Sequence, residues 1–360
     1  MLIWGDEMIS VIIPVYNKER YISRVVDMLK RQTYKNIEII FIDDGSTDNS
    51  YNIAKLYEDG KKIFVYRQKN QGVSAARNKG MTYANGEWLS FLDPDDLIAE
   101  NYFEDLISVA ADYDIISCCC YAVGDNGKKI NNFFLNSMSF YGDQKKILFY
   151  QLLDDTYGQP GKTYTAIGVP WGKLYKKSLV LSNNLKFDIK LKKQEDNIFN
   201  MYAFKYAKRI FYLNKPLYFY SLEHIKNDYV SNYDSYAVRN VIELQKERMT
   251  FFTENCALLD KSGEDFLNNA TISSLVSSFN KCLLNKANTQ TYFEKRNEYL
   301  YIIRLPFFAK IIRNLDILRI NGFVHKIVAL SMKCSLFYPI NFIWYFRSIY
   351  VKIKYKNHKK

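Results

Sequence analysis

Three carboxylates lie within four positions of the sequence, at Asp93, Asp95 and Asp96, directly after the apolar run from Trp88 to Leu92. Such a cluster repels itself unless a cation or an array of hydrogen-bond donors offsets the negative charge. Carboxylates at the end of a strand suit Mg²⁺ or Mn²⁺, which complete their coordination with water and substrate phosphates. The segment therefore predicts a metal-bound diphosphate, with an acidic turn in which Asp96 caps the next helix as the alternative.

A second pair of carboxylates, Asp43 and Asp44, follows the apolar run from Ile37 to Ile42. Carboxylates in this position can accept hydrogen bonds from a nucleobase N–H or from a ribose hydroxyl. An ordinary turn, with Ser46 or Asp48 capping the helix that follows, is the alternative. That alternative leaves Asp43 and Asp44 without a role.

Arg77 belongs to a third polar segment, which runs from Asn70 to Asn78 and opens a helix near Ser74. The N-terminus of a helix favours anions, so an arginine in its first turns could pair with a diphosphate or support the aspartates. A surface ion pair is the alternative interpretation.

The elements that must position these residues are visible as alternating apolar runs and helical patterns. Helices are expected from a cap at Asn17, from Ser46 to Asp48 as far as Gly60, and from Ser74 to Gly86. The alternation predicts an α/β domain with a mostly parallel central sheet, in which ligands bind beyond the carboxyl ends of the strands. The expected strands are Ile9 to Val15, Ile37 to Ile42, Ile63 to Tyr66 and Trp88 to Leu92.

The remaining chain is less regular at first and then helical. We expect a strand from Ile115 to Val123, a loop-rich stretch around Gly158 to Gly172, and helices beyond Asn232. Two regions follow from this pattern: a catalytic domain over residues 1–230 and a helical, basic region over residues 231–360.

The charge of the chain is concentrated at one end. Of the net charge of +12, +11 lies from Tyr301 onward, where twelve Lys or Arg face the single acid Asp316. The nearly neutral body argues against nucleic-acid binding, whereas a basic tail rich in aromatic residues predicts contact with an anionic membrane surface. Packing of the tail on the catalytic domain, or on a second subunit of a homo-oligomer, is the alternative.

Neither a secretory signal nor an uninterrupted apolar stretch of about twenty residues is evident in the sequence. The six cysteines form no CxxC pairs, and three of them are consecutive, at Cys118 to Cys120, which is poor geometry for disulfides. We therefore expect reduced thiols and a cytoplasmic protein, held peripherally at the inner face of the cell membrane.

Taken in order, the motifs of this chain resemble those of the family-2 glycosyltransferases, which have the GT-A fold. The resemblance runs from about Met8 to Tyr220 and rests on the segments Ile13 to Glu19, Asp43 to Asp48, Asn70 to Asn78 and Leu92 to Asp96. It implies an inverting, metal-dependent transfer of a hexosyl or N-acetylhexosaminyl group from a nucleotide sugar, expected to be a UDP-sugar. The acceptor would be a hydroxyl of a lipid-linked or surface glycan, as in capsule or cell-envelope polysaccharide synthesis.

The resemblance also implies roles for individual residues. Asp43 is the candidate for the uracil contact, and in the Asp-x-Asp motif Asp95 is the principal ligand of Mn²⁺ or Mg²⁺, with Asp93 nearer the ribose or a metal-bound water. The expected nucleotide-sugar site consists of Pro14, Tyr16, Asn17, Glu19, Asp43, Asp44, Asn70, Arg77 and Asp93.

On the acceptor side, the resemblance makes Asp196, next to Glu195, the general base that takes the proton of the acceptor hydroxyl. Without the family, both acids would be explained by the dipole of a helix in whose first turn they lie. Trp171 is expected to line the acceptor side through its indole, or else to belong to the core. Many relatives carry an arginine in the stretch that closes over the diphosphate, and here only His224 or Lys226 could replace it.

Two other functions compete with this interpretation. A nucleotidyltransferase would also combine such a fold with a metal, but it needs a Gly-rich basic phosphate loop, which the residues after Val15 do not provide. A degenerate sugar-nucleotide binder, acting as a partner subunit, would have no need of the intact Asp93, Asp95 and Asp196.

Overall fold

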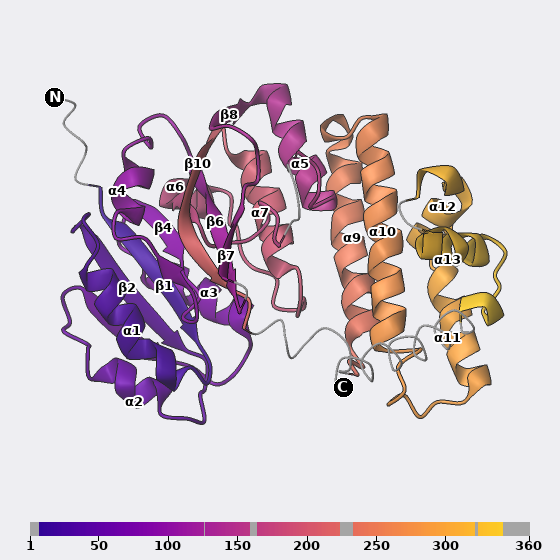
Figure 1. Cartoon of the computed structure of the whole chain (residues 1–360), viewed down its shortest axis with the longest axis horizontal. Coiled ribbons are helices and arrows are strands. Elements are labelled where there is room, and N and C mark those ends of the chain that lie inside the picture. Colours follow the sequence, from indigo (N-terminus) through magenta and orange to yellow (C-terminus); the bar gives the residue numbers. More distant parts are fainter. Residues whose placement is uncertain (1–6, 126, 159–163, 224–232, 321–322, 341–360) are drawn as a thin grey trace. The chain divides into compact units, whose positions relative to one another are not determined.

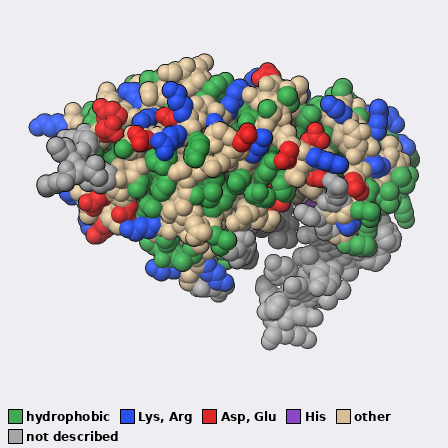
Figure 2. All heavy atoms as spheres, turned by 90° about the horizontal axis from the view of Figure 1, so that it is seen from above, with side chains coloured by type: hydrophobic (Ala, Val, Ile, Leu, Met, Phe, Trp, Pro, Cys, Tyr) green, Lys and Arg blue, Asp and Glu red, His purple; other side chains and the backbone are tan. Residues whose placement is uncertain are grey.

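The computed structural model describes residues 7–125, 127–158, 164–223, 233–320 and 323–340 (Figure 1). The chain divides into two compact units, Met1–Lys226 and Asn227–Lys360, which we call the sheet unit and the helical unit. The predicted basic end from Lys352 to Lys360, and the candidates His224 and Lys226, lie outside the described residues. On the face seen in Figure 2, acidic and basic side chains are interspersed.

A mixed sheet forms the centre of the sheet unit. Its strands are β1 (Ile9–Val15), β2 (Ile37–Asp43), β3 (Ile63–Arg67), β4 (Trp88–Phe91), β5 (Leu97–Ile98), β6 (Ile115–Gly124), β7 (Gly127–Asn131), β8 (Met138–Tyr141), β9 (Lys173–Lys176) and β10 (Arg209–Ser221). Among the described residues their order is β3-β2-β1-β4-β9-β6-β10-β5, with β7 beside β6 and β8 beside β10.

The four strands predicted first form a parallel block, β3-β2-β1-β4. Every residue of β1 and β2 is buried, as expected for strands covered on both faces. The alternating residues Ile9, Val11 and Ile13 share a core with helix α1 (Glu19–Lys30), while Ile12 on the opposite face meets Gly80 of α3 (Val73–Tyr83). The predicted α/β fold with its mostly parallel central sheet is confirmed.

The second half of the sheet contains antiparallel neighbours. The predicted strand from Ile115 is β6, which pairs with β10 in parallel and with β7 and β9 in antiparallel fashion. Pro216 lies at a register shift in β10, where its missing N–H interrupts no regular ladder. The helices of this half are α4 (Tyr102–Ile107), α5 (Lys146–Leu153), α6 (Lys177–Ser182) and α7 (Glu195–Tyr206).

The expected start of the first helix was wrong. Lys18, not Asn17, is the N-cap of α1, and its side chain makes no capping hydrogen bond. Asn17 adopts a left-handed φ of 52°, and its Oδ1 accepts a hydrogen bond of 2.8 Å from the backbone N of Thr47 instead. Because this oxygen serves the neighbouring turn, it is no longer free to cap α1. The second helix, α2 (Ser50–Lys55), is also shorter than expected at both ends.

The helical unit has a core of its own. Its helices are α9 (Ala237–Glu254), α10 (Lys261–Lys281), α11 (Tyr292–Ile303), α12 (Pro306–Asn314) and α13 (Phe323–Lys333). Buried residues of all five, including Phe279, Tyr299, Phe308 and Val328, form one cluster. The predicted helical character of this region is confirmed. Among the described residues, no helix has the length and apolar composition needed to cross a membrane.

All six cysteines are free thiols. Cys118, Cys119 and Cys120 are buried in β6, and Cys282 is buried in the helical unit, whereas Cys256 and Cys334 are exposed. Burial raises the pKa of Cys119 and of Cys282 to about 11.

Candidate active site

A cavity of about 650 Å³ opens where β1, β2 and β4 end, and most of the predicted site residues line it. The ends coincide because β1 and β2 pair in register, with Val15 opposite Asp43. The predicted residues in the cavity wall are Pro14, Tyr16, Asp44, Asn70, Arg77, Asp93, Asp95, Trp171, Glu195 and Asp196. Asn17, Glu19 and Asp43 lie outside this wall.

Asn17 and Glu19 connect two neighbouring turns. Oδ1 of Asn17 accepts from the backbone N of Thr47, and Oε2 of Glu19 accepts from the backbone N of Asn49 at 2.8 Å. The turn after β1 is thereby fixed to the turn after β2. In the structure these two side chains contact protein backbone.

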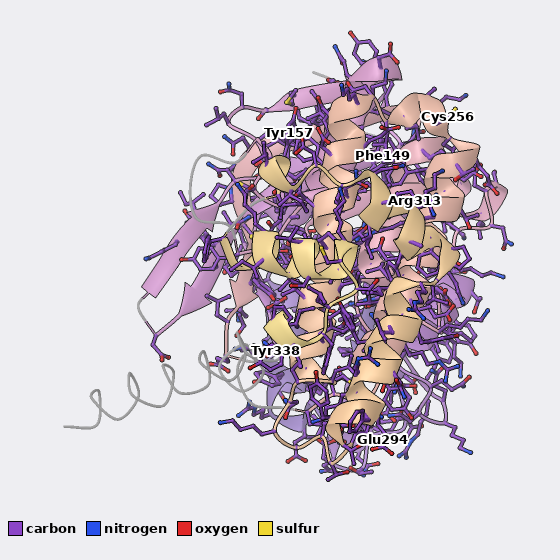
Figure 3. The ribbon with its side chains drawn as sticks, turned by 90° about the vertical axis from the view of Figure 1, so that its right-hand side faces the viewer. Phe149, Tyr157, Cys256, Glu294, Arg313 and Tyr338 are labelled. Carbon is purple, nitrogen blue, oxygen red and sulfur yellow. The ribbon has the colours of Figure 1, made fainter. Side chains whose placement is uncertain are left out.

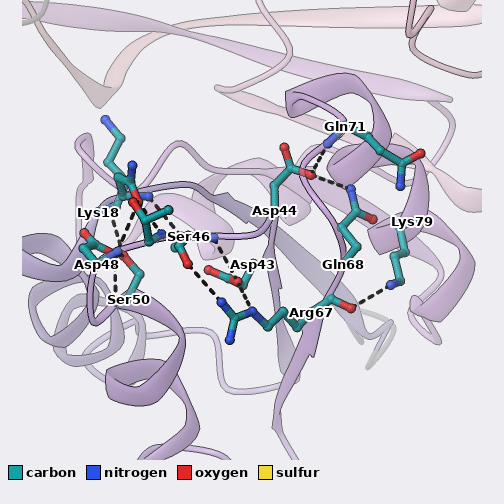
Figure 4. Close-up of polar contacts among 12 residues, drawn as sticks. Lys18, Asp43, Asp44, Ser46, Asp48, Ser50, Arg67, Gln68, Gln71 and Lys79 are labelled. Carbon is teal, nitrogen blue, oxygen red and sulfur yellow. Dashed lines mark hydrogen bonds and ion pairs between the residues drawn. The ribbon is translucent and has the colours of Figure 1, made fainter.

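The two aspartates at the carboxyl end of β2, its last residue Asp43 and the following Asp44, have different partners (Figure 4). Asp43 is 1% exposed, and its Oδ2 lies 3.0 Å from Nε of Arg67. Its Oδ1 is buried without a hydrogen-bond donor among the described residues. A buried acceptor without a donor is costly, and a ligand N–H would satisfy it.

Asp44 holds the loop that precedes α3. Its Oδ1 accepts from Nε2 of Gln68 at 2.7 Å and from the backbone N of Gln71 at 2.9 Å, and its Oδ2 accepts from the backbone N of Gly72 at 2.7 Å. Both carboxylate oxygens are therefore engaged. Gly45 beside it has a φ of +73°, and a Cβ there would lie 2.8 Å from the backbone N of Asn70.

Arg77 joins the carboxylates of two distant segments. It is 4% exposed, and it binds Oδ1 of Asp93 at 3.0 Å through Nη2 and Oε1 of Glu195 at 3.1 Å through Nη1. Burial alone would lower the pKa of Arg77, but the surrounding carboxylates outweigh burial and raise it. Arg77 therefore carries a permanent positive charge at the cavity wall.

The three acids after β4 have three different environments. Asp93 pairs with Arg77, and Oδ2 of Asp95 lies 2.7 Å from Nζ of Lys18. Asp96 was expected as a possible helix cap, but its Oδ2 accepts from the hydroxyl of Tyr218 at 2.7 Å, and its Oδ1 accepts from the backbone of β10. Burial, and next the charge of Asp93, raise the pKa of Asp96 well above its usual range.

The residues present suit a divalent cation in part. Within the described residues, no cluster of three or more His, Cys, Asp or Glu side chains could hold a metal by itself. Mg²⁺ and Mn²⁺ sites that serve nucleotides, however, use one or two carboxylates together with substrate phosphates. Asp93 and Asp95 both line the cavity, and neither Oδ2 of Asp93 nor Oδ1 of Asp95 has a donor in the described part of the chain. These two free carboxylate oxygens suit a divalent cation whose remaining ligands come from a diphosphate.

Asp196 lies in the first turn of α7, next to Glu195, which Arg77 joins to Asp93. The residue before the helix, Gln194, has a left-handed φ of 63°, which is a strained conformation for a residue with a side chain. Burial, and next the Glu195 carboxylate, raise the pKa of Asp196 to about 7, against the opposing effect of Arg77. A carboxylate with such a pKa can accept a proton near neutral pH.

Asn200, one turn along α7, binds the loop that carries Trp171. It is fully buried; its Nδ2 donates to O of Gly168 at 2.8 Å and to O of Asp196 at 3.1 Å, and its Oδ1 accepts from the hydroxyl of Tyr175 at 2.8 Å. These bonds join the backbone of the Asp196 turn to the loop. The indole of Trp171 is 3% exposed and stacks on Tyr218, with ring centroids 4.3 Å apart.

Sequence reasoning missed several residues of the cavity wall. Lys18 lies inside the first motif, and Tyr220 lies inside the stretch that lacks the arginine. Both could have been predicted from their places in these segments. Outside the wall, Lys173 gave no signal: it is fully buried, its Nζ donates to O of Val169 at 2.6 Å, and burial lowers its pKa to about 7. Thr165 also lines the cavity.

Comparisons with known proteins identify the class. The family described as glycosyl transferase family 2 matches residues 10–161. EpsH of Bacillus subtilis (strain 168), assigned to the glycosyltransferases, is 33% identical over 310 residues, which are 84% of this chain and 85% of EpsH. Glycosyltransferase GlyA of Streptococcus pneumoniae serotype 4 is 36% identical over 220 residues, which are 60% of this chain and 31% of GlyA.

The sheet and its cavity therefore belong to a glycosyltransferase, and the chain is a member of glycosyltransferase family 2. Among solved structures, residues 1–349 of S. aureus TarS superimpose with a TM-score of 0.63 at 20% sequence identity, covering 91% of this chain and 87% of that one. This likeness shows a common GT-A fold.

Proposed function

We propose that the chain transfers a sugar from a nucleotide sugar, with a UDP-sugar as the expected donor, to a hydroxyl of a lipid-linked or surface-glycan acceptor. The observation that carries this proposal is the single cavity that contains Asp93 and Asp95 together with Asp196. The donor's diphosphate and the acceptor's hydroxyl must meet in one space, and these carboxylates supply the two chemical functions that the reaction needs. TarS, which shares the fold, has been solved with UDP and with UDP-GlcNAc.

The nucleotide is expected to bind at the turns after β1 and β2. Tyr16 is 47% exposed at the cavity, so its ring is free to stack on a base. The buried Oδ1 of Asp43 suits an imino N–H such as that of uracil, since it has no donor in the described part of the chain. Asp44 would act indirectly, by holding the loop from Asn70 to Gly72 against the cavity.

In the proposed mechanism, the acceptor oxygen attacks the anomeric carbon while the bond to the diphosphate breaks on the opposite face, which inverts that centre. Asp196 takes the proton of the acceptor hydroxyl, and the bonding electron pair leaves with the diphosphate. A divalent cation held by Asp95 and Asp93 would neutralise the leaving group. Arg77 keeps Glu195 and Asp93 in place and adds a fixed positive charge.

Calorimetry with UDP, with and without Mn²⁺, tests the donor half of the proposal. We expect binding that strengthens at least about tenfold with Mn²⁺ in the parent protein and loses this dependence in Asp95→Ala. A panel of UDP-sugars tested for slow donor hydrolysis would then name the sugar. If UDP does not bind under either condition, the donor carries another nucleotide or the chain is a degenerate relative.

We further propose that the helical unit holds the enzyme at an anionic membrane surface. In its described part, large apolar side chains are exposed close to basic residues in the sequence: Tyr301 (65%), Leu318 (82%) and Phe323 (79%) accompany Arg304 and Arg313. Figure 3 labels Arg313, at the end of α12, and Tyr338, beyond α13. A lipid-linked acceptor would reside at such a surface.

A further inference from the structure

Lys18 brings to the cavity a cation that none of the roles above uses. Its Nζ lies 2.7 Å from Oδ2 of Asp95, with the two side chains 30% and 17% exposed. The pair connects the turn after β1 to the turn after β4. The side chain that the resemblance makes the principal metal ligand is thus already bound by an ammonium group.

The backbone of Lys18 is fixed independently of this ion pair. Its N–H donates to Oγ of Ser50 at 2.7 Å (Figure 4). The preceding Asn17 is held through its side-chain oxygen by Thr47. Only the four-carbon side chain of Lys18 is left to move. Lysine suits this task because its ammonium is a compact charge on a flexible stem.

The backbone of Asp95 is fixed as well. Nη2 of Arg24 donates to O of Asp95 at 2.9 Å, and the guanidinium of Arg24 stacks on the ring of Tyr21, 5.0 Å from its centroid. The turn that carries the carboxylate therefore does not depend on Lys18 for its position. When the ammonium leaves, Oδ2 of Asp95 stays at the cavity.

A divalent cation at the open Oδ1 of Asp95 would lie close to the ammonium at Oδ2 of the same carboxylate, and the two positive charges would repel each other. A partly exposed Lys–Asp pair is weak and easily exchanged, and a diphosphate offers the displaced ammonium several charged oxygens nearby. We infer that Lys18 is a diphosphate-binding residue, which Asp95 holds at the cavity until a divalent cation takes over that carboxylate. This inference rests on the proposed function, since it requires a metal and a diphosphate.

The arrangement couples the two ligands. The cation releases Lys18 toward the diphosphate, and the diphosphate draws Lys18 away from Asp95, so each ligand favours the other. Without the ammonium, the cation alone should bind more tightly and the nucleotide more weakly. These opposite changes in the two affinities distinguish a lysine that moves from Asp95 to the diphosphate from one that only stabilises the loop.

The experiment uses the full chain and its Lys18→Met variant. Mn²⁺ affinity without nucleotide is measured from the electron paramagnetic resonance of free Mn²⁺, and UDP affinity at saturating Mn²⁺ by calorimetry. We expect Lys18→Met to bind Mn²⁺ about three- to tenfold more tightly and UDP about tenfold more weakly. Arg20→Met is the matched control, because Arg20 lies over the same Tyr21 ring and forms no ion pair with Asp95 in the described residues; it should retain both affinities.

The Lys18→Arg variant keeps the positive charge, so its affinities for Mn²⁺ and UDP should stay close to those of the parent. This variant separates the loss of the charge from a loss of structure. Unchanged or weaker Mn²⁺ binding by Lys18→Met, or unchanged UDP binding, overturns the inference and leaves the proposed function standing. If the parent protein binds no Mn²⁺ even with UDP present, the metal dependence itself fails, and the inference fails with it.

Discussion

At the scale of the single residue, the protonation state of Asp196 should control the rate of sugar transfer. Burial and the adjacent Glu195 raise its pKa to about 7, and a general base works only when deprotonated. We expect the logarithm of kcat for transfer to rise with a slope of about one below pH 7 and to level off above it. A pH profile of kcat from pH 5.5 to 8.5 checks this.

Asp196→Asn supplies the control for that profile. Its amide cannot take a proton, so kcat should fall by about 10²- to 10⁴-fold, while UDP binding stays near that of the parent. A parent profile that stays flat down to pH 5.5, or a variant that keeps its rate, would exclude Asp196 as the base.

The sequence predicted the place of a residue in the site well only where that residue lies close to the end of a strand. Tyr16, Asp44 and Asp93 come just after the ends of strands β1, β2 and β4, and parallel strands bring their carboxyl ends to one edge. The pairing of Arg77 with Glu195 spans 118 residues, and no local spacing encodes it. Asn200 was missed for the same reason, since a buried amide inside a helix resembles any other polar residue in the sequence.

At the scale of the element, the turn after β2 should tolerate no side chain at Gly45. Both Gly45 and Gly60 have a left-handed φ, +73° and +64°, but only Gly45 faces backbone: a Cβ there would lie 2.8 Å from N of Asn70. Gly60→Ala should cost about 1 kcal/mol from backbone strain alone. Gly45→Ala should cost about 1–3 kcal/mol more, because the loop must move.

Urea unfolding of the two alanine variants measures the difference. Weakened UDP binding should accompany Gly45→Ala only, since Asn70 lines the cavity and the surroundings of Gly60 are open. Equal destabilisation by both substitutions would show that the contact with Asn70 does not matter.

The hydrogen bonds between α7 and the loop of Trp171 form a second element-scale test. Asn200→Leu removes a buried amide that binds Gly168, Asp196 and Tyr175, so unfolding should become easier by about 3 kcal/mol and kcat should fall. Asn183→Leu is the control: that amide makes one local bond, to O of Leu179, and its loss should cost about 1 kcal/mol. Retained kcat in Asn200→Leu would mean that Asp196 does not depend on this link.

The strands that the sequence predicted are those with largely apolar runs, β1 to β4 and β6. It predicted no strand for β7, which is largely exposed, for β8, which is short, or for β9, whose four residues include two lysines. β8 and β9 form by pairing with partners far along the chain, whereas β7 pairs with the adjacent β6. Periodicity within a short segment does not contain the information about distant partners.

At the scale of the whole molecule, substitutions in the helical unit should affect membrane binding without affecting the nucleotide. Removing the chain from Leu305 onward would destroy the core formed by Phe308, Ile311 and Val328, so point substitutions are the cleaner test. Leu318→Ser with Phe323→Ser should weaken binding to phosphatidylglycerol vesicles about tenfold or more, since each exposed apolar side chain contributes on the order of 1 kcal/mol.

Vesicle sedimentation measures this effect, and Leu181→Ser serves as the control. Leu181 is 59% exposed but belongs to the sheet unit, so its loss should leave vesicle binding unchanged. Binding that does not differ between the double variant and the parent would assign the exposed residues of the helical unit to protein contacts instead.

The distribution of the thiols allows the native chain to be labelled with a dye that reports contact with lipid. Cys256 and Cys334 are exposed in the helical unit, whereas the cysteines of the sheet unit are buried in β6, where burial raises the pKa of each thiol and suppresses the reactive thiolate. A maleimide fluorophore should therefore label only the helical unit, with no engineered cysteine. A dye at Cys334, four residues from the exposed Tyr338, would change its emission when lipid replaces the water around it.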